Sequence, residues 1–305
     1  MSTVLSVEGK KITDLTAAEE LNDTDLLIIH DGDGMKTITA KEFRAAVDVL
    51  ADAGYHNSIY RGKDLTDVYT VSELAVKVAA EDWDDLYIGD YITVSITTDL
   101  GGTEEVDLMI GGFNFFLNNG DTALTTPHLL MLPKDCFATT SYMNDSSTTE
   151  GGYASSYMHT TVLPIYADAL SEALDGHVLT HRRLLSTTMS TSYDAMGGAG
   201  RTGAASAWSW SDTDLALMTE PMVFGTTAWS SSGYDIGDGQ MQIPLFAARP
   251  DLKIAHLGKD GSSRYSWWLS AVASSPSFAY CASNGNASLL SASYSYGVRP
   301  YFLFG

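Results

Sequence analysis

The chain has 305 residues, a length typical of two domains or of one large domain with an appendage. It carries 38 acidic and 17 basic residues, which gives a formal net charge of −21. A chain this acidic repels nucleic-acid phosphates and anionic lipid surfaces, so we expect it to bind neither nucleic acid nor membrane. Hydrophobic residues make up 45%, too many for a disordered protein.

The N-terminal MSTVLSVEGKK has no basic stretch followed by an apolar core, so no secretory signal is expected. Apolar runs such as Leu26 to Ile29 are too short to span a bilayer, and no membrane insertion is expected. Two cysteines, Cys136 and Cys281, are too few for a disulfide framework or a four-cysteine zinc site. They could pair, but a reducing cytoplasm favours buried thiols.

The first fifty residues predict a small separate unit. Capping-box spacings at Thr16 to Glu19 and at Thr39 to Glu42 predict two short helices. Between them, strands over 25–30 and 36–39 flank Asp31-Gly-Asp-Gly34, which we interpret as a hairpin turn because it lacks the distal ligands of a calcium loop. Such a unit buries little surface alone, so we expect oligomerisation to stabilise it.

Beyond residue 50, composition and apolar periodicity predict a series of elements. In chain order these are a linker over 51–64, a helix over 71–80, strands over 91–97 and 106–117, a loop over 139–161, a helix opened by Pro164, a strand over 177–185 and a long polar loop over 187–240. Thr70 to Glu73 supplies a capping box for the first helix. Ile165, Ala169, Leu170 and Leu174 form one apolar face of the second.

No motif in the chain predicts catalysis. Gly198 to Gly203 matches G-x-G-x-x-G, but no strand precedes it and no apolar helix follows, so a flexible loop is favoured over a dinucleotide site. His177 and His181 share a face but lack a third metal ligand, which favours a structural pair. No nucleophile elbow, zinc-protease motif or P-loop is present. We expect a protein that is not an enzyme and holds no cofactor or metal.

The C-terminal part has an unusual composition. The 34 residues from Tyr265 to Val298 contain no Asp, Glu, Lys or Arg, whereas the overall charged share of 18% would place about six there. Ser, Ala, Tyr and Asn dominate instead, which is the composition of a binding paratope. Tyr offers a broad amphipathic contact area, and Ser and Asn offer adaptable hydrogen bonds. The composition therefore favours a recognition surface.

The same part of the chain also contains candidate core residues. Trp267, Trp268, Phe278 and Tyr301-Phe-Leu-Phe304 are expected in the core. The run SLLSASYSY from Ser288 to Tyr296 is harder to bury and is expected at the surface. The alternative is a buried sheet, in which apolar positions would alternate with polar ones.

Residues 12–43, ITDLTAAEELNDTDLLIIHDGDGMKTITAKEF, resemble the start of many phage tail-fibre proteins. In that family a helix–strand–turn–strand module precedes the receptor-binding part and usually forms a trimer. The resemblance implies attachment to other tail proteins through the N-terminus, a homotrimer and location in the virion after synthesis in the bacterial cytoplasm.

Residues 85–305 resemble a C-type-lectin-fold family of phage and gut bacterial proteins. Its motifs occur here in order: Gly151-Gly-Tyr-Ala-Ser-Ser-Tyr-Met158, Leu163-Pro164, His181-Arg-Arg-Leu-Leu-Ser186, Glu220 to Gly225, Trp267-Trp-Leu-Ser270, Asn284-Gly-Asn-Ala287 and Ala292-Ser-Tyr-Ser-Tyr-Gly-Val-Arg-Pro300. Many members are variable proteins of diversity-generating retroelements. The fixed letters of their C-terminal motifs, W-W-L-R-S, N-G-N-A and A-S-x-S-x-G-V-R-P, are called the frame below. The Arg of the first motif is missing after Leu269.

In this family an error-prone reverse transcriptase rewrites adenines near the C-terminus. An AAY asparagine codon can then give Ser, Tyr, Leu, Ala or Pro, but not Glu, Lys, Trp or Met, which fits the charge-free segment. The resemblance implies twelve candidate recognition residues, all of them within the reachable set: Ala273, Ser275, Pro276, Ser277, Tyr280, Ala282, Ser288, Leu289, Leu290, Ser291, Tyr294 and Tyr296.

We therefore expect an α+β protein in which a C-type-lectin-like domain follows a small N-terminal oligomerisation module. The expected boundaries are 1–55 for the attachment and trimerisation module, 56–84 for a linker and helix, and 85–305 for the lectin-like domain, with a variable region at about 268–300. The expected function is recognition of a bacterial cell-surface receptor, protein or glycan, at the tip of a phage tail fibre or a prophage equivalent.

Two alternatives remain open. The charge-free segment could be a subunit interface of a structural tail or adhesin component. The fold also hosts formylglycine-generating oxidases, whose chemistry uses paired cysteines, and Cys136 and Cys281 are the candidates here. The calcium and sugar triplets of true C-type lectins, E-P-N, Q-P-D and W-N-D, are absent, so the fold does not by itself imply a sugar ligand.

Overall fold

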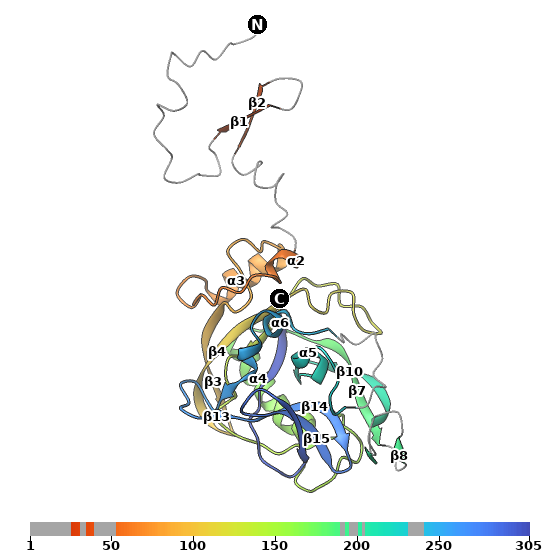
Figure 1. Cartoon of the computed structure of the whole chain (residues 1–305). Helices are drawn as coiled ribbons and strands as arrows, with labels where there is room; N and C mark the ends of the chain where they lie inside the picture. Colours follow the sequence, from red (N-terminus) through yellow and green to blue (C-terminus); the bar gives the residue numbers. More distant parts are fainter. Residues whose placement is uncertain are drawn as a thin grey trace. The chain divides into compact units, whose positions relative to one another are not determined.

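The computed structural model describes residues 26–30, 35–39, 53–189, 193–194, 201–202, 205–230 and 241–305 (Figure 1). The chain divides into two units, Met1–Ala51 and Asp52–Gly305. This division falls before the expected boundary at residue 55, and it assigns the segment 56–84 to the second unit. No helix among the described residues is both long enough and apolar enough to cross a membrane.

In the first unit, β1 (Leu26–His30) pairs antiparallel with β2 (Met35–Thr39). His30 lies opposite Met35, which confirms the predicted hairpin. The turn Asp31-Gly-Asp-Gly34 and the helices predicted from the two capping boxes lie outside the described residues.

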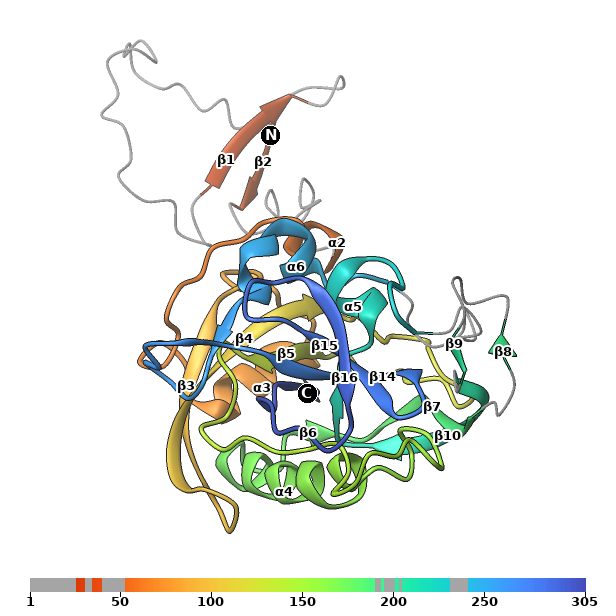
Figure 2. The ribbon, with the colours of Figure 1, turned by 60° about the horizontal axis from the view of Figure 1, so that its bottom comes forward.

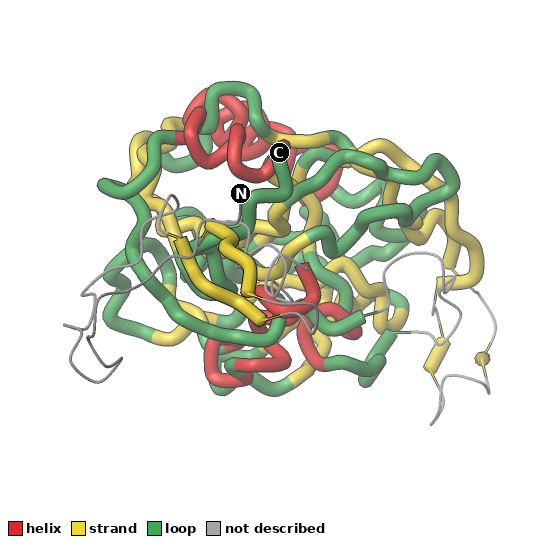
Figure 3. Tube along the Cα trace, turned by 90° about the horizontal axis from the view of Figure 1, so that it is seen from above, coloured by secondary structure: helices red, strands yellow, loops and turns green. Residues whose placement is uncertain are grey.

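The described part of the second unit is a mixed α+β structure in which strands predominate (Figure 3). Its central sheet has six antiparallel strands: β11 (Leu215–Leu217), β17 (Pro300–Phe304), β5 (Leu129–Pro133), β4 (Gly102–Phe113) and β3 (Tyr91–Thr98) in this order, with β6 (Val178–Leu179) also paired with β17. β17 therefore lies inside the sheet, between β11 and β5.

Both predicted strands at the start of this sheet are present. The strand expected over 91–97 is β3. The strand expected over 106–117 is β4, which begins earlier, at Gly102, and ends at Phe113 because Asn114 turns the chain with a φ of 51°. The pairing of β4 with β5 has a register shift between Ile110 and Gly112. A Cβ at Gly111 would lie 2.6 Å from the Leu132 side chain and 2.8 Å from the Leu130 side chain, so glycine lets these side chains of β5 pack closely there.

The central sheet is buried on both faces. In β5, Leu129 and Met131 belong to one hydrophobic cluster, and Leu130 and Leu132 belong to a second. Alternate residues of a strand point to opposite faces, so the apolar run of β5 fills two cores. Helices α3 (Val71–Ala79) and α4 (Leu163–Ala173) contribute to the first cluster, and α4 packs against β3 (Figure 2). Helices α5 (Glu220–Phe224) and α6 (Pro244–Ala248) contribute to the second.

A separate three-stranded sheet contains β14 (Trp267–Ser274), β15 (Ser277–Cys281) and β16 (Ala287–Ser291). Neighbouring residues of β14 point to opposite faces, so Trp267 enters the second cluster and Trp268 the first. Both indole rings are fully buried, as are Phe278 and the residues 301–304. The predicted core of the C-terminal part is therefore confirmed.

The two helices predicted after residue 70 are confirmed, with a change of boundary in the second. At α3, the Thr70 hydroxyl accepts from the Glu73 N–H at 3.2 Å, and the Glu73 carboxylate accepts from the Thr70 N–H at 2.8 Å. The second helix begins before Pro164, because a π-helical turn, η3 (Met158–Val162), leads into α4. The expected loop over 139–161 is therefore helical from residue 158. Pro164 is tolerated in the first turn of α4, where its missing N–H is not required.

The expected long loop over 187–240 contains regular structure. β7 (His181–Met189) pairs with β10 (Ala205–Thr213), so the strand expected over 177–185 is divided between β6 and β7. The Glu220 carboxylate, fully buried in α5, accepts hydrogen bonds from the N–H groups of Ala228, Trp229 and Ser230.

Of the G-x-G-x-x-G match, only residues 201–202 are described, as β9 (Arg201–Thr202), which pairs with β8 (Tyr193–Asp194). The remaining short elements are β12 (Ala255–His256), β13 (Arg264–Tyr265) and the 3-10 turn η5 (Pro250–Lys253).

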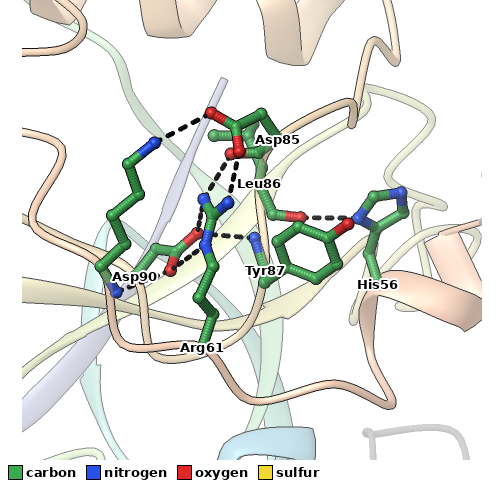
Figure 4. A network of polar contacts seen from close by, with 7 residues as sticks. His56, Arg61, Asp85, Leu86, Tyr87 and Asp90 are labelled. Atoms are coloured by element: carbon green, nitrogen blue, oxygen red, sulfur yellow. Dashed lines mark hydrogen bonds and ion pairs between the residues drawn. The ribbon is translucent and has the colours of Figure 1, made fainter. Parts of the chain in front are cut away.

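The segment expected to be a linker is held by charged side chains (Figure 4). The Arg61 guanidinium donates to Asp85 and to both oxygens of the fully buried Asp90, at 2.6 and 3.0 Å. The Asp90 carboxylate also accepts from the Tyr87 N–H at 2.8 Å. In the short helix α2 (Ala53–His56), the buried His56 donates from Nδ1 to the Leu86 carbonyl at 2.6 Å. The described residues 53–64 are therefore part of the second unit.

Candidate recognition surface

The three-stranded sheet carries most of the candidate recognition residues. In its register Tyr280 lies between Trp268 of β14 and Ser288 of β16. The first seven residues of β14 are buried, whereas all five residues of β16 are half-buried. Exposure therefore increases across the sheet from one edge strand, β14, to the other edge strand, β16 (Figure 2).

Burial separates the twelve candidate recognition residues into two groups. Ten are half-buried or exposed: Ser275, Pro276, Tyr280, Ala282, Ser288, Leu289, Leu290, Ser291, Tyr294 and Tyr296. Tyr294 is 56% exposed. Ala273 and Ser277 do not fit the expected surface, because they are only 1% and 7% exposed. Ala273 lies within the covered strand β14, and Ser277 lies between Ser274 and Ser291 in the middle of the sheet.

Two candidate tyrosines contact a buried frame residue. The rings of Tyr280 and Tyr296 have centroids 4.7 Å apart, and they lie 6.1 and 5.1 Å from the Trp268 ring. The Trp268 indole N–H donates to the Ser141 carbonyl at 2.9 Å, which fixes the ring. Burial, followed by a hydrogen bond with Tyr280, raises the pKa of Tyr296 to about 12. Tyr296 is therefore a neutral hydrogen-bonding group at physiological pH.

A second segment, residues 139–149, lies beside the candidate recognition residues. Ser141 and Tyr296 exchange two backbone hydrogen bonds, both of 2.9 Å. The Ser147 hydroxyl is hydrogen bonded to the Ser291 hydroxyl at 2.6 Å, and the Ser295 hydroxyl donates to Thr140 at 2.9 Å. From its sequence this segment was expected only to be a loop. It is rich in Ser and Thr hydroxyls, and that composition was the available signal.

Gly297, a frame residue, allows two segments to approach closely. Its carbonyl accepts from the Trp268 N–H at 3.2 Å, and its N–H donates to the Ser266 carbonyl at 2.9 Å. A Cβ at this position would lie 2.5 Å from the Cys136 sulfur and 3.2 Å from the Ser266 carbonyl oxygen. Only glycine fits there without displacing these neighbours.

Arg299, the charged residue of the frame, is fully buried. Its guanidinium donates to three carbonyl oxygens, those of Pro133 at 2.9 Å, Leu252 at 2.9 Å and Lys134 at 2.7 Å. It also lies over the Trp267 ring, 5.2 Å from the centroid. Burial lowers the pKa of Arg299 from its usual value. This side chain joins the end of β5, η5 and the start of β17.

Cys136 and Cys281 are free and buried, which agrees with the favoured expectation of unpaired thiols. Burial raises the pKa of both thiols to about 12. Thiolate chemistry needs a lowered pKa and access to solvent. Neither thiol has the properties that the oxidase alternative requires.

The two histidines that were expected to be a structural pair make separate contacts. His177 is hydrogen bonded to the Gly305 carbonyl at 3.2 Å, and the buried His181 ring to the Tyr301 hydroxyl at 3.2 Å. Burial, with the nearby Arg183, lowers the pKa of His181 to about 3, so its ring is neutral. Within the described ranges, no group of three or more His, Cys, Asp or Glu side chains is arranged to hold a metal ion.

No family model matches the chain, and comparisons with curated proteins and with solved structures found no match. What the surface does is therefore inferred from its own residues and their geometry.

Proposed function

We propose that the chain is a receptor-binding protein whose C-terminal region displays a variable recognition surface. In this proposal the second unit is a C-type-lectin-like scaffold, and the whole chain acts at the tip of a phage tail fibre or a prophage equivalent. The ligand is a receptor on the bacterial cell surface.

The observation that carries this proposal is that one short segment combines a buried part of the frame with mostly accessible candidate positions. The frame residues Asn284, Asn286, Ser293 and Ser295 are exposed as well. Trp267, Trp268, Val298, Arg299 and Pro300 are buried, and each stabilises the core or joins distant strands. Ten of the twelve candidate positions reach the surface from the same 34-residue stretch. A scaffold of this kind lets surface side chains change without repacking the core, as antibody loops do.

The scaffold assignment is supported by the arrangement of the two sheets. A small three-stranded sheet bears the candidate residues, and the strand that follows them, β17, lies inside the larger sheet. Helix α4 packs on that larger sheet through contacts with β3 and β11. The variable segment is thus enclosed in sequence by elements of the core.

The N-terminal unit is proposed to attach the chain to the tail and to form a trimer. Its hairpin β1–β2 lies within residues 12–43, which resemble tail-fibre attachment modules. We assign to it attachment to other tail proteins and formation of a homotrimer. Three copies of a weak site raise the overall affinity through effective concentration.

The test is deep sequencing of this gene across one natural population. Substitutions should accumulate at the ten exposed or half-buried candidate positions, while Trp268 and Gly297 to Pro300 stay fixed. An even distribution of substitutions would contradict a variable receptor-binding surface.

A second measurement separates recognition from a subunit interface. Tyr294→Ala should lower attachment to host cells and leave the oligomeric state unchanged by analytical ultracentrifugation. A variant that dissociates the oligomer but retains attachment as a monomer would support the interface alternative instead.

A further inference from the structure

A cavity of about 210 Å³ lies where the segment 139–166 meets the end of the C-terminal segment. Three tyrosines, four Ser or Thr hydroxyls and three aliphatic side chains line it, and no Asp, Glu, Lys, Arg or His is among them. Two lining residues, Ser295 and Val298, belong to the frame, and none of the ten belongs to the twelve candidate recognition residues. The cavity therefore lies outside the positions proposed to vary.

The cavity contains a buried hydrogen-bonding group without a partner in the described chain. The Tyr166 side chain is fully buried, and its ring stacks on Phe137 with centroids 3.9 Å apart. Its hydroxyl makes no hydrogen bond of normal geometry to another described residue, although the Thr139 side chain lies near enough to interact with it. Burial and the nearby Glu104 raise the pKa of Tyr166, so the phenol stays protonated and can donate. Leaving such a group unpaired is unfavourable, so a ligand group that accepts its hydrogen bond would be stabilised here.

The rim provides stacking and hydroxyl groups together. The Tyr142 and Tyr157 rings lie with centroids 5.0 Å apart and a tilt of 32°. The hydroxyls of Thr140 and Ser295 are already hydrogen bonded to each other at 2.9 Å, which orients both. Aromatic faces take up the C–H face of a sugar ring, while hydroxyl side chains pair with its O–H groups.

The charge of the lining residues and the size of the cavity limit which class of ligand can bind there. No lining residue is cationic, and the chain carries a net charge of −21, so an anionic group would be repelled. A purely apolar group would leave the Tyr166 hydroxyl and the Ser and Thr hydroxyls unpaired. A volume of about 210 Å³ is smaller than pockets for whole drug-sized ligands, roughly 300–1,000 Å³, and suits one ring of a larger molecule.

We propose that this cavity is a calcium-independent subsite for one neutral sugar ring of a cell-surface glycan. This inference rests on the proposed receptor-binding function and assigns the ligand class. The subsite holds one sugar ring, and the neighbouring variable side chains, among them Tyr294 and Tyr296, contact the rest of the glycan. Ser295 lies between these two positions in the chain and lines the cavity.

The experiment measures binding of the full chain to a panel of methyl glycosides by saturation-transfer NMR with excess EDTA. The neutral probes are the methyl pyranosides of glucose, galactose, mannose and N-acetylglucosamine, and the anionic probe is a methyl sialoside. We expect at least one neutral probe to bind and the sialoside not to bind. Absence of neutral binding, or binding only when calcium replaces EDTA, would overturn the proposal.

Matched variants locate the binding. Tyr166→Phe removes only the buried hydroxyl and should weaken the bound probe about tenfold. Thr140→Val, which removes a rim hydroxyl without changing shape, should weaken it by a smaller factor and serves if Tyr166→Phe fails to fold. Tyr69→Phe, at a half-buried tyrosine outside the cavity lining, is the control and should leave binding unchanged. Binding that neither cavity variant weakens would place the sugar elsewhere and contradict the proposal.

Cell attachment distinguishes this inference from the proposed function. Tyr294→Ala should reduce attachment and leave methyl glycoside binding intact. If attachment depends on Tyr294 but no neutral glycoside binds, the receptor-binding function stands and the sugar subsite fails. If a glycoside binds in the cavity but neither Tyr294→Ala nor changes at Ser288 reduce attachment, the subsite stands and the proposed function fails.

Discussion

In the segment 56–90 the main contacts are made by charged side chains, whereas in the segment 265–298 they are made by backbone strand pairing and by aromatic rings. Arg61 and Asp90 specify each other through directed, charge-assisted hydrogen bonds, so neither can be replaced without leaving a buried group unpaired. Tyr280 and Ser288 lie opposite each other because their strands pair, whatever their side chains are. The first arrangement fixes the identity of residues, and the second fixes only the position of the backbone.

The charge-free segment is followed directly by a charged residue. The Arg299 guanidinium donates to three carbonyl oxygens, and the Asp135 carboxylate also favours its charged form. One buried ionic residue thus anchors the chain where the charge-free segment ends. Substitutions at the charged anchoring residues and in the charge-free segment test this difference separately.

The largest effect is expected from Arg299→Met. Three buried carbonyl oxygens would lose their donor, and we expect the free energy of unfolding to fall by about 3 kcal/mol or more. Urea denaturation followed by tryptophan fluorescence measures this. The control is Arg264→Met at an exposed position, which should change stability by no more than about 0.5 kcal/mol. Equal losses in the two variants would show that Arg299 is not an anchor.

A smaller loss is expected from Asp90→Asn in the charged segment. The buried carboxylate accepts from Arg61 and from two backbone N–H groups, and its neutral replacement should cost about 2 kcal/mol. Asp85→Asn is the matched control, because the Asp85 side chain is 48% exposed and its ion pair should contribute less than about 1 kcal/mol. The same denaturation experiment compares them, and a greater loss in Asp85→Asn would contradict the assignment.

Gly297→Ala tests the close approach of the frame to Cys136. The added Cβ would overpack against the sulfur and should destabilise the protein by about 1–2 kcal/mol. Cys136→Ala removes the sulfur, so the double variant should lose less than the sum of the two single changes. A double-mutant cycle by thermal or urea unfolding measures this coupling. Strict additivity would mean that the contact with Cys136 does not limit this position.

The smallest effects on stability are expected at the candidate recognition residues. Ser288→Tyr and Tyr294→Ala should each change the free energy of unfolding by no more than about 0.5 kcal/mol. Ala273→Tyr is the informative contrast, because Ala273 is buried in β14 and a larger side chain has no room. If Ala273→Tyr lowered the free energy of unfolding no more than Ser288→Tyr, burial would not explain which of the twelve candidate positions tolerate substitution.

Local signals in the sequence predicted the elements that depend on local contacts. The capping box from Thr70 to Glu73 predicted α3, and the alternation after Tyr91 predicted β3. The hairpin β7–β10 was missed, although the alternating W-S-W-S from Trp208 to Ser211 indicates a strand. A strand becomes stable only with its partner, here β7, and the residues 190–204 between them obscure the pairing in the sequence.

The candidate surface was predictable in composition but not in its details. The absence of charge between Tyr265 and Val298 identified the segment, and the large apolar side chains of Trp267 and Trp268 identified them as core. The burial of Ala273 and Ser277 depends on which strands flank them, which no local pattern encodes. The contact between Ser147 and Ser291 joins residues that are distant in the chain, so it appears only in the folded structure.

The position of β17 has a consequence for the order in which the protein is made. β17 follows the candidate recognition residues in the chain and lies between β11 and β5. The ribosome must therefore complete the recognition segment before the central sheet can close, and the domain folds only after synthesis of this segment. A recognition segment that aggregates or pairs wrongly as it emerges would leave the sheet open and its apolar faces exposed to cellular proteases. Folding itself would then act as the first selection on new recognition sequences.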